Sequence, residues 1–217
     1  MSEQPASSNT APQELNFFQR YIFWIIFGCA LTAVTGVISY LSYVQSTAPR
    51  GPFAHMGGDF TLQSVNGPVS LEDYRGKVVV LYFGYTSCPD VCPTEMALLG
   101  NAIHSLSKEE QANVQGIFIG VDPERDKLDT LDGYAKFFYP NFVGVTGTVD
   151  ELHQVAGAYG AYYRKVEMKD SALGYGIDHS SYFFVINKDG RLVNTIGHSS
   201  DVKAIAAGLK PYIDAKS

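Results

Sequence analysis

The stretch KVVVLYFGYTSCPDVCP, residues 77–93, decides the fold of this chain. Its first part, 77–85, is a β-branched and aromatic run without an acidic residue, which is typical of a strand buried on both faces. The run leads into a loop that carries Cys88 and Cys92, and Pro93 suits the first turn of a helix. Apolar residues at helical spacing follow at Met96, Leu99, Ile103 and Leu106. The stretch therefore predicts a buried strand that turns into a helix through a cysteine loop.

The segments around this stretch predict an α/β fold, with a central sheet flanked by helices. Residues 60–71 form a predicted hairpin that turns at Asn66-Gly67. Strand and helix patterns then alternate: strand 115–121, helix 128–138, strand 142–145, helix 152–159, hairpin 182–196 and closing helix 202–213. This order predicts a mostly parallel sheet that binds ligands at the carboxyl ends of its strands. With a cysteine pair at the first such end, the arrangement is thioredoxin-like.

Composition excludes several classes of protein. The chain has 217 residues, of which 46 % are hydrophobic and 18 % are charged, and this balance excludes a disordered protein. A net charge of −6 argues against nucleic-acid binding, which needs clustered Lys and Arg. Three cysteines are too few for a disulfide scaffold, so a pair among them is expected to be functional.

One segment, 21–44, is expected to cross a membrane. It contains no Asp, Glu, Lys, Arg or His, and at ~1.5 Å per residue it spans about 36 Å, enough for a hydrocarbon core of ~30 Å. A cleaved leader with a cleavage site at 46–48 and a buried helix of a soluble domain are the alternatives. We expect an uncleaved anchor, preceded by a disordered tail at 1–20 and followed by a linker at 45–58 and a globular domain at 59–217.

Cys88 and Cys92 are four positions apart at the predicted start of a helix. Both sulfurs can then lie on one side, beside backbone N–H groups and the positive end of the helix, an environment that lowers thiol pKa values. Because thiolates both attack disulfides and bind metals, the spacing alone is compatible with a redox pair and with a metal site.

A metal site needs further ligands, and His179 is the candidate among five histidines. It is expected in a loop just ahead of a buried strand, where a sheet can bring it beside the cysteines. The other four are expected in the linker, along the helix that starts near Cys92, on a helix surface and near the closing helix: His55, His104, His153 and His198. Two thiolates and an imidazole form a soft set that suits Cu(I), or Cu(II) with a fourth oxygen ligand. Structural zinc requires four protein ligands, so copper is predicted.

Three motifs, in this order behind one apolar span, resemble the Sco/SenC family: TSCPDVCP at 86–93, VDPERD at 121–126 and DHS at 178–180. The resemblance covers residues 59–215. It implies a thioredoxin-like copper metallochaperone that assists assembly of the CuA centre of cytochrome c oxidase.

The resemblance also implies which residues bind copper, namely Cys88, Cys92 and His179. It further implies a membrane anchor with the domain in the periplasm or the intermembrane space, and we expect a single-pass anchor in the inner membrane with the domain facing the periplasm. The flanking residues Arg20 and Arg50 leave the orientation undecided, because they place one positive charge at each end of the span.

Charged residues around the motifs are expected to support the site. The acidic and basic residues after the second strand are predicted to form a loop network that shapes the site or a partner surface: Asp122, Glu124, Arg125 and Asp126. Lys127 stands where many relatives carry threonine and touches no ligand position. Asp178 is expected either to orient the imidazole of His179 or to remain a solvated carboxylate.

Two functions are compatible with these residues. The first is a copper carrier that passes its ion to the CuA-bearing subunit of cytochrome c oxidase or to another periplasmic copper protein. The second is an enzyme, a membrane-tethered thiol–disulfide reductase that maintains the cysteines of a copper-protein partner through Cys88 and Cys92. Against the reductase, three residues separate the cysteines where two are usual, and 178–182 contains no proline. A peroxidase lacks its expected threonine, because position 85 is Tyr85.

Overall fold

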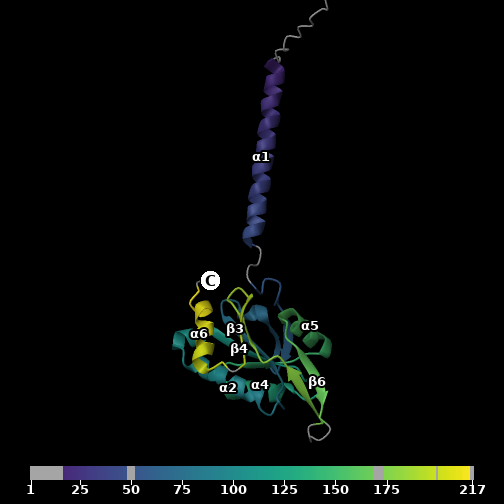
Figure 1. Cartoon of the computed structure of the whole chain (residues 1–217), viewed down its shortest axis with the longest axis vertical. Helices are drawn as coiled ribbons and strands as arrows, with labels where there is room; N and C mark the ends of the chain where they lie inside the picture. The colour runs from purple at the N-terminus through teal and green to yellow at the C-terminus, as the bar shows by residue number, and fades with distance from the viewer. Residues whose placement is uncertain (1–16, 48–51, 169–173, 199, 216–217) are drawn as a thin grey trace, which may run out of the picture. The chain divides into compact units, whose positions relative to one another are not determined.

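The computed structural model describes residues 17–47, 52–168, 174–198 and 200–215 (Figure 1). The chain divides into two compact units. The first holds helix α1 (Phe17–Thr47), in which Tyr21–Tyr43 is long and apolar enough to cross a membrane. The second unit holds all the strands and the other helices. The first part of the predicted tail and residues 48–51 of the predicted linker lie outside the described residues.

A five-stranded sheet forms the centre of the second unit, with the strand order β5-β4-β3-β8-β9. These strands are β3 (Val78–Gly84), β4 (Val114–Gly120), β5 (Val143–Val145), β8 (Phe183–Ile186) and β9 (Leu192–Ile196). Every residue of β3 and β4 is buried, as their uninterrupted apolar sequences predict.

The sheet is mixed, whereas the sequence predicted a mostly parallel one. The β3–β4 and β4–β5 ladders are parallel, but β3–β8 and β8–β9 are antiparallel. The predicted hairpin β8–β9 adds to the free edge of β3, so it contributes two antiparallel ladders. The central strand β3 therefore has one parallel and one antiparallel neighbour.

Helices cover both faces of the sheet (Figure 1). They are α2 (Val91–His104), α4 (Leu128–Phe138), α5 (Val149–Tyr159) and α6 (Val202–Ile213), with the short α3 (Lys108–Ala112) and η1 (Leu71–Tyr74). On one face, Tyr134 of α4 packs on Phe118 with ring centroids 4.9 Å apart. On the other face, Tyr159 of α5 packs on Phe83 and Phe184, at 6.4 and 6.2 Å. The alternation of side chains along β3 and β4 thus serves two apolar layers.

Two features at the start of the second unit differ from the sequence prediction. In the hairpin of β1 (Thr61–Ser64) and β2 (Gly67–Ser70), Ser64 pairs with Gly67, so the turn residues are 65 and 66. Gly67 is instead the first residue of β2, with a φ of +110° that favours glycine. The end of the predicted linker also contacts the unit, because the N–H of Gly57 donates to the Ala158 carbonyl at 2.6 Å.

A second hairpin, which the sequence analysis missed, carries the candidate histidine. Strands β6 (Tyr163–Glu167) and β7 (Tyr175–His179) form a separate two-stranded antiparallel sheet. The prediction that His179 lies in a loop was wrong, because it is the last residue of β7 and pairs with Tyr163. These strands are short and partly exposed, so their apolar residues only alternate and form no continuous run.

Candidate metal centre

The two cysteines lie at the corner where β3 turns into α2. Cys88 is half-buried in the connection, and Cys92 is the second residue of α2 and fully buried. Both are free thiols, and the backbone N–H of Cys92 donates to the Cys88 sulfur at 3.4 Å. A backbone N–H in the first turn of α2, which has no partner within the helix, therefore points at the Cys88 sulfur. The same turn carries the side chain of Cys92.

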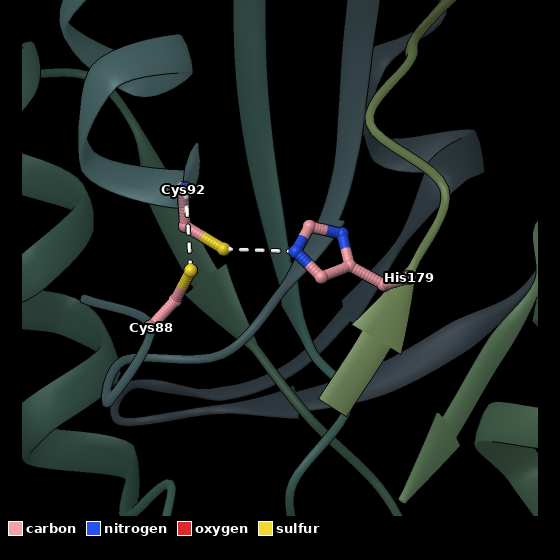
Figure 2. A group of neighbouring side chains, drawn as sticks. All are labelled: Cys88, Cys92 and His179. Carbon is pink, nitrogen blue, oxygen red and sulfur yellow. Dashed lines mark hydrogen bonds between the residues drawn. The ribbon is translucent and has the colours of Figure 1, made fainter. Parts of the chain in front are cut away.

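His179 completes a three-residue cluster from the end of β7. Its Nε2 lies 3.3 Å from the Cys92 sulfur, and the ligand atoms of Cys88, Cys92 and His179 all lie within 4.8 Å of one another. Figure 2 shows the imidazole reaching from the strand end toward both sulfurs. Nδ1 of His179 lies 3.2 Å from the Ser180 carbonyl, which accepts a hydrogen bond from the tautomer protonated at Nδ1. In that tautomer Nε2 presents its lone pair to the sulfurs, as binding of a metal ion requires.

One tyrosine of β3 and a second tyrosine directly after this strand hold the imidazole in place. The rings of Tyr82 and Tyr85 each lie 5.9 Å from the ring of His179, at interplanar angles of 82° and 88°. Both tyrosines are buried, at 0 % and 6 % exposed. Edge-to-face packing against two fixed rings restricts the rotation of the histidine, so its donor atom is pre-oriented toward the cysteine loop.

The two thiols differ in their electrostatics. Hydrogen bonds from the side chain of Cys92, then from that of His179 and from backbone N–H groups, lower the pKa of Cys88 to about 3, against the opposing effect of burial. The pKa of Cys92 is raised, because it donates to the Cys88 thiolate and because it is buried. At neutral pH the pair thus holds one thiolate, on the more exposed sulfur, and one thiol.

The donor set fits a single soft ion. Bonds of about 2.3 Å to sulfur and about 2.0 Å to nitrogen require donors roughly 4 Å apart, close to the separations in this cluster. Sulfur and imidazole donors favour Cu(I) among the common metals. The other four histidines do not join the cluster. His198 donates to Glu95, His104 bonds the Gly100 carbonyl, His153 stacks on Tyr163, and His55 is exposed in a turn.

The loop at 122–126 contacts the two segments that carry the cluster residues, as the loop-network prediction requires. Asp126 accepts hydrogen bonds from the backbone and the hydroxyl of Thr86, at 3.0 and 2.6 Å. Arg125 donates to the Tyr175 carbonyl on β7 at 3.1 Å. Asp178 does not orient the imidazole, because its carboxylate pairs with Arg164 at 3.0 Å on the exposed side of the hairpin.

Glu95 was missed by the sequence analysis. It lies one turn beyond Cys92, is 1 % exposed, and accepts a hydrogen bond of 2.6 Å from Nδ1 of His198. A carboxylate on the apolar face of a helix, between Cys92 and Met96, is the signal that could have identified it, because carboxylates are rarely buried without a partner.

The fold and the cluster together define a class of protein. A thioredoxin-like domain with two cysteines at a strand-to-helix corner, joined by a histidine from a later strand, is equipped for thiol redox chemistry or for soft metal ions. The SCO1/SenC family model matches residues 48–214. The chain belongs to the SCO1/SenC family, which confirms both the resemblance and the thioredoxin-like fold.

Known members of the family are similar over most of this chain. SCO1 homolog 1, mitochondrial, of Arabidopsis thaliana is 36 % identical over 169 residues, which are 77 % of this chain and 50 % of that protein. The crystal structure of Arabidopsis thaliana ScoI with copper bound is 36 % identical, with a TM-score of 0.66, over 73 % of this chain and 98 % of that one. BsSco, a member of the Sco family of cytochrome c oxidase assembly proteins with an identified disulfide switch, is 25 % identical, with a TM-score of 0.58, over 75 % and 95 %. The chain covers 54 % of SCO2, mitochondrial, of Saccharomyces cerevisiae, so it spans about half of the curated relatives named here.

Proposed function

We propose that this chain is a membrane-anchored copper metallochaperone that assists assembly of the CuA centre of cytochrome c oxidase. Copper is its cargo, held by Cys88, Cys92 and His179. The observation that carries the proposal is the convergence of these three donor atoms within 4.8 Å. The copper bound to Arabidopsis thaliana ScoI and the oxidase-assembly role of the family of BsSco support it.

The donor set suits an ion that is bound and then released. Three ligands are enough for Cu(I), and a fourth oxygen ligand accommodates Cu(II). Cys88 already favours the thiolate form, whereas Cys92 has to release its proton when copper binds. Cys88 and His179 are only half-buried, so incoming ligands reach the ion from their side. Transfer then proceeds by ligand exchange to the CuA-bearing subunit or to another periplasmic copper protein.

A thiol–disulfide reductase is the second candidate. The low pKa of Cys88 makes it a nucleophile at neutral pH, and the related BsSco has a disulfide switch. In this reaction the Cys88 thiolate attacks a partner's disulfide, and Cys92 then resolves the mixed disulfide. The partner gains two thiols and the chain gains a Cys88–Cys92 disulfide.

A copper titration of the full chain in detergent separates the two functions. We expect His179→Ala to weaken copper binding by more than about 100-fold, because removing a ligand costs more than removing a group that merely supports one. His55→Ala, an exposed histidine in a turn, is the matched control and should bind like the wild type. If the chain is instead a reductase, His179→Ala should keep most of its dithiol activity. Wild-type copper affinity in His179→Ala would falsify the three-ligand site.

The proposal includes a location in the cell. We infer a tail at 1–20, an uncleaved single-pass anchor at 21–44, a linker at 45–58 and a copper-binding domain at 59–217 that faces the periplasm from the inner membrane. The apolar length of α1 supports the anchor. A reporter enzyme that is active only in the periplasm, fused after residue 217, should be active. If only a reporter that works in the cytoplasm is active when it is fused at that position, the domain does not face the periplasm.

A further inference from the structure

We propose that the loop at 122–126 is a latch that holds the histidine-bearing hairpin against the cysteine loop, with Arg125 as the positioning residue for His179. The inference rests on the proposed copper site, which it deepens. It assigns to the loop a role in copper affinity that involves no contact with the ion.

The hairpin β6–β7 needs such a latch because it is not part of the central sheet. A two-stranded sheet is marginally stable by itself, and its placement depends on the contacts it makes. The ion pair Arg164–Asp178 does not place the hairpin, because it joins the two strands β6 and β7 to each other and is exposed.

Arg125 contacts the hairpin and the groups that support it, including the ring of Tyr85, whose centroid lies 5.8 Å from its guanidinium. Its Nη1 donates to the Tyr175 carbonyl at 3.1 Å, and its guanidinium lies 3.7 Å from the centroid of the Tyr175 ring. Its Nε donates to the buried carboxylate of Asp122, which forms an ion pair with it. Tyr175 is on the same strand as His179, so Arg125 holds the strand that presents the imidazole.

Neighbouring side chains strengthen the same contact. The hydroxyl of Tyr175 donates to Asp122 at 2.9 Å. Lys165, on the other strand of the hairpin, pairs with Glu124 at 2.9 Å and lies 3.7 Å from the centroid of the Tyr175 ring. The Tyr175 ring is thus held between two cations, and both strands of the hairpin are tied to the loop.

The other end of the loop holds the cysteine side of the site. Asp126 is 2 % exposed, and its Oδ1 accepts two hydrogen bonds from Thr86, which precedes Cys88 by two positions. The N–H of Val121 also donates to the Gly84 carbonyl at 2.8 Å, which ties the start of the loop to the end of β3. One short segment therefore links the strand that carries the imidazole to the loop that carries Cys88.

The test is a set of copper titrations of the full chain in two backgrounds, wild type and His179→Ala. We expect Arg125→Met to weaken copper binding about 10- to 100-fold in the wild-type background, the range typical of groups that orient a metal ligand. It should have no further effect in His179→Ala, because Arg125 acts only through that ligand. Arg164→Met removes the exposed ion pair of the same hairpin and should change the affinity by less than about twofold.

A second measurement reads the latch without copper. In the metal-free protein, Arg125→Met should accelerate hydrogen exchange of the β6–β7 amides and leave the β3–β4 amides protected. Arg125→Lys keeps a cation near Asp122 and should lie between wild type and Arg125→Met, which provides a milder variant if the latter folds poorly. If hydrogen exchange of the β3–β4 amides rises as much as that of the β6–β7 amides, the substitution destabilises the whole domain and the latch proposal is wrong.

The outcomes distinguish this inference from the proposed function. If His179→Ala weakens copper binding but Arg125→Met does not, the latch is wrong and the copper site stands. If Arg125→Met weakens binding equally in both backgrounds, it acts on the cysteines and the positioning role is wrong. If His179→Ala binds like the wild type, the copper proposal fails, and the exchange experiment still decides whether Arg125 holds the hairpin.

Discussion

The buried sulfur of Cys92 lies 3.3 Å from Nε2 of His179, although 87 positions separate the two residues in the chain. The contact joins the first turn of α2, the helix that follows β3 of the central sheet, to the end of β7, a strand of the separate two-stranded sheet. With Cys88 it makes a compact set of soft donors whose electrostatics, packing and supporting contacts each have a measurable consequence.

The reactivity of Cys88 should be nearly independent of pH. Its pKa is lowered to about 3, so the thiolate is fully formed above that value, and alkylation by iodoacetamide should stay flat between about pH 5 and about pH 8. An ordinary thiol gains about tenfold in rate per pH unit over this range. Peptide mapping by mass spectrometry resolves Cys88 from Cys92 and Cys29.

The cause of this shift can be tested with two variants of Cys92. The side chain of Cys92 is the largest contributor to the low pKa of Cys88, through a hydrogen bond. Cys92→Ala removes the donor, so the alkylation rate of Cys88 should begin to rise with pH. Cys92→Ser keeps a hydroxyl donor and should preserve most of the plateau. A tenfold rise per pH unit in the wild type is incompatible with this account.

Gly84→Ala should damage the site from the strand side. A Cβ at Gly84 would lie 2.8 Å from the Cys92 sulfur and 2.9 Å from Cε2 of Phe118. We expect a loss of about 1–3 kcal/mol in the free energy of unfolding, measured by guanidinium denaturation, together with weaker copper binding because Cys92 is displaced.

Gly133→Ala is the matched control. Gly133 is exposed within α4, and a Cβ there meets nothing within 4 Å. Alanine should raise the free energy of unfolding by about 0.5–1 kcal/mol and leave copper binding unchanged. If Gly84→Ala had the same free energy of unfolding and the same copper affinity as Gly133→Ala, the close packing of β3 against Cys92 would not contribute to stability or to copper binding.

The hydrogen bond between His198 and Glu95 should stabilise the fold without affecting copper. His198→Ala leaves a carboxylate that is 1 % exposed without this donor, at a cost of about 1–3 kcal/mol in the free energy of unfolding. The double variant Glu95→Met with His198→Ala should be more stable than His198→Ala alone, because it removes the buried carboxylate as well. Chemical denaturation measures the free energy of unfolding of each variant. If the losses caused by the Glu95 and His198 substitutions simply add in the double variant, the two residues are not coupled.

Much of the central sheet was predictable from local patterns. The strands β3 and β4 are uninterrupted apolar runs, and α4 and α5 carry apolar residues at helical spacing. The edge at which the hairpin β8–β9 joins was not predictable, because a local pattern carries no information about which strand becomes its neighbour. The mixed sheet follows from that choice of edge.

The candidate site was predictable in its residues but not in its supports. The spacing of Cys88 and Cys92 and the motif around His179 singled out the cluster. The pairing of Asp178 with Arg164 was not predicted, because it depends on the β6–β7 hairpin, whose short and exposed strands have a weak pattern. Glu95 was missed for a similar reason, since its partner comes from a distant loop.

By itself, the sequence determined a buried strand that ends in two cysteines, an apolar N-terminal span and membership of a family. Hydrophobic patterning and short motifs are local, so they can be identified along the chain. Only the tertiary structure decided that His179 reaches the sulfurs, that one cysteine is a thiolate, and that the loop at 122–126 contacts the segments that carry both halves of the site. These properties depend on distances between distant residues and on burial, which arise when the sheet, the helices and the hairpin pack together.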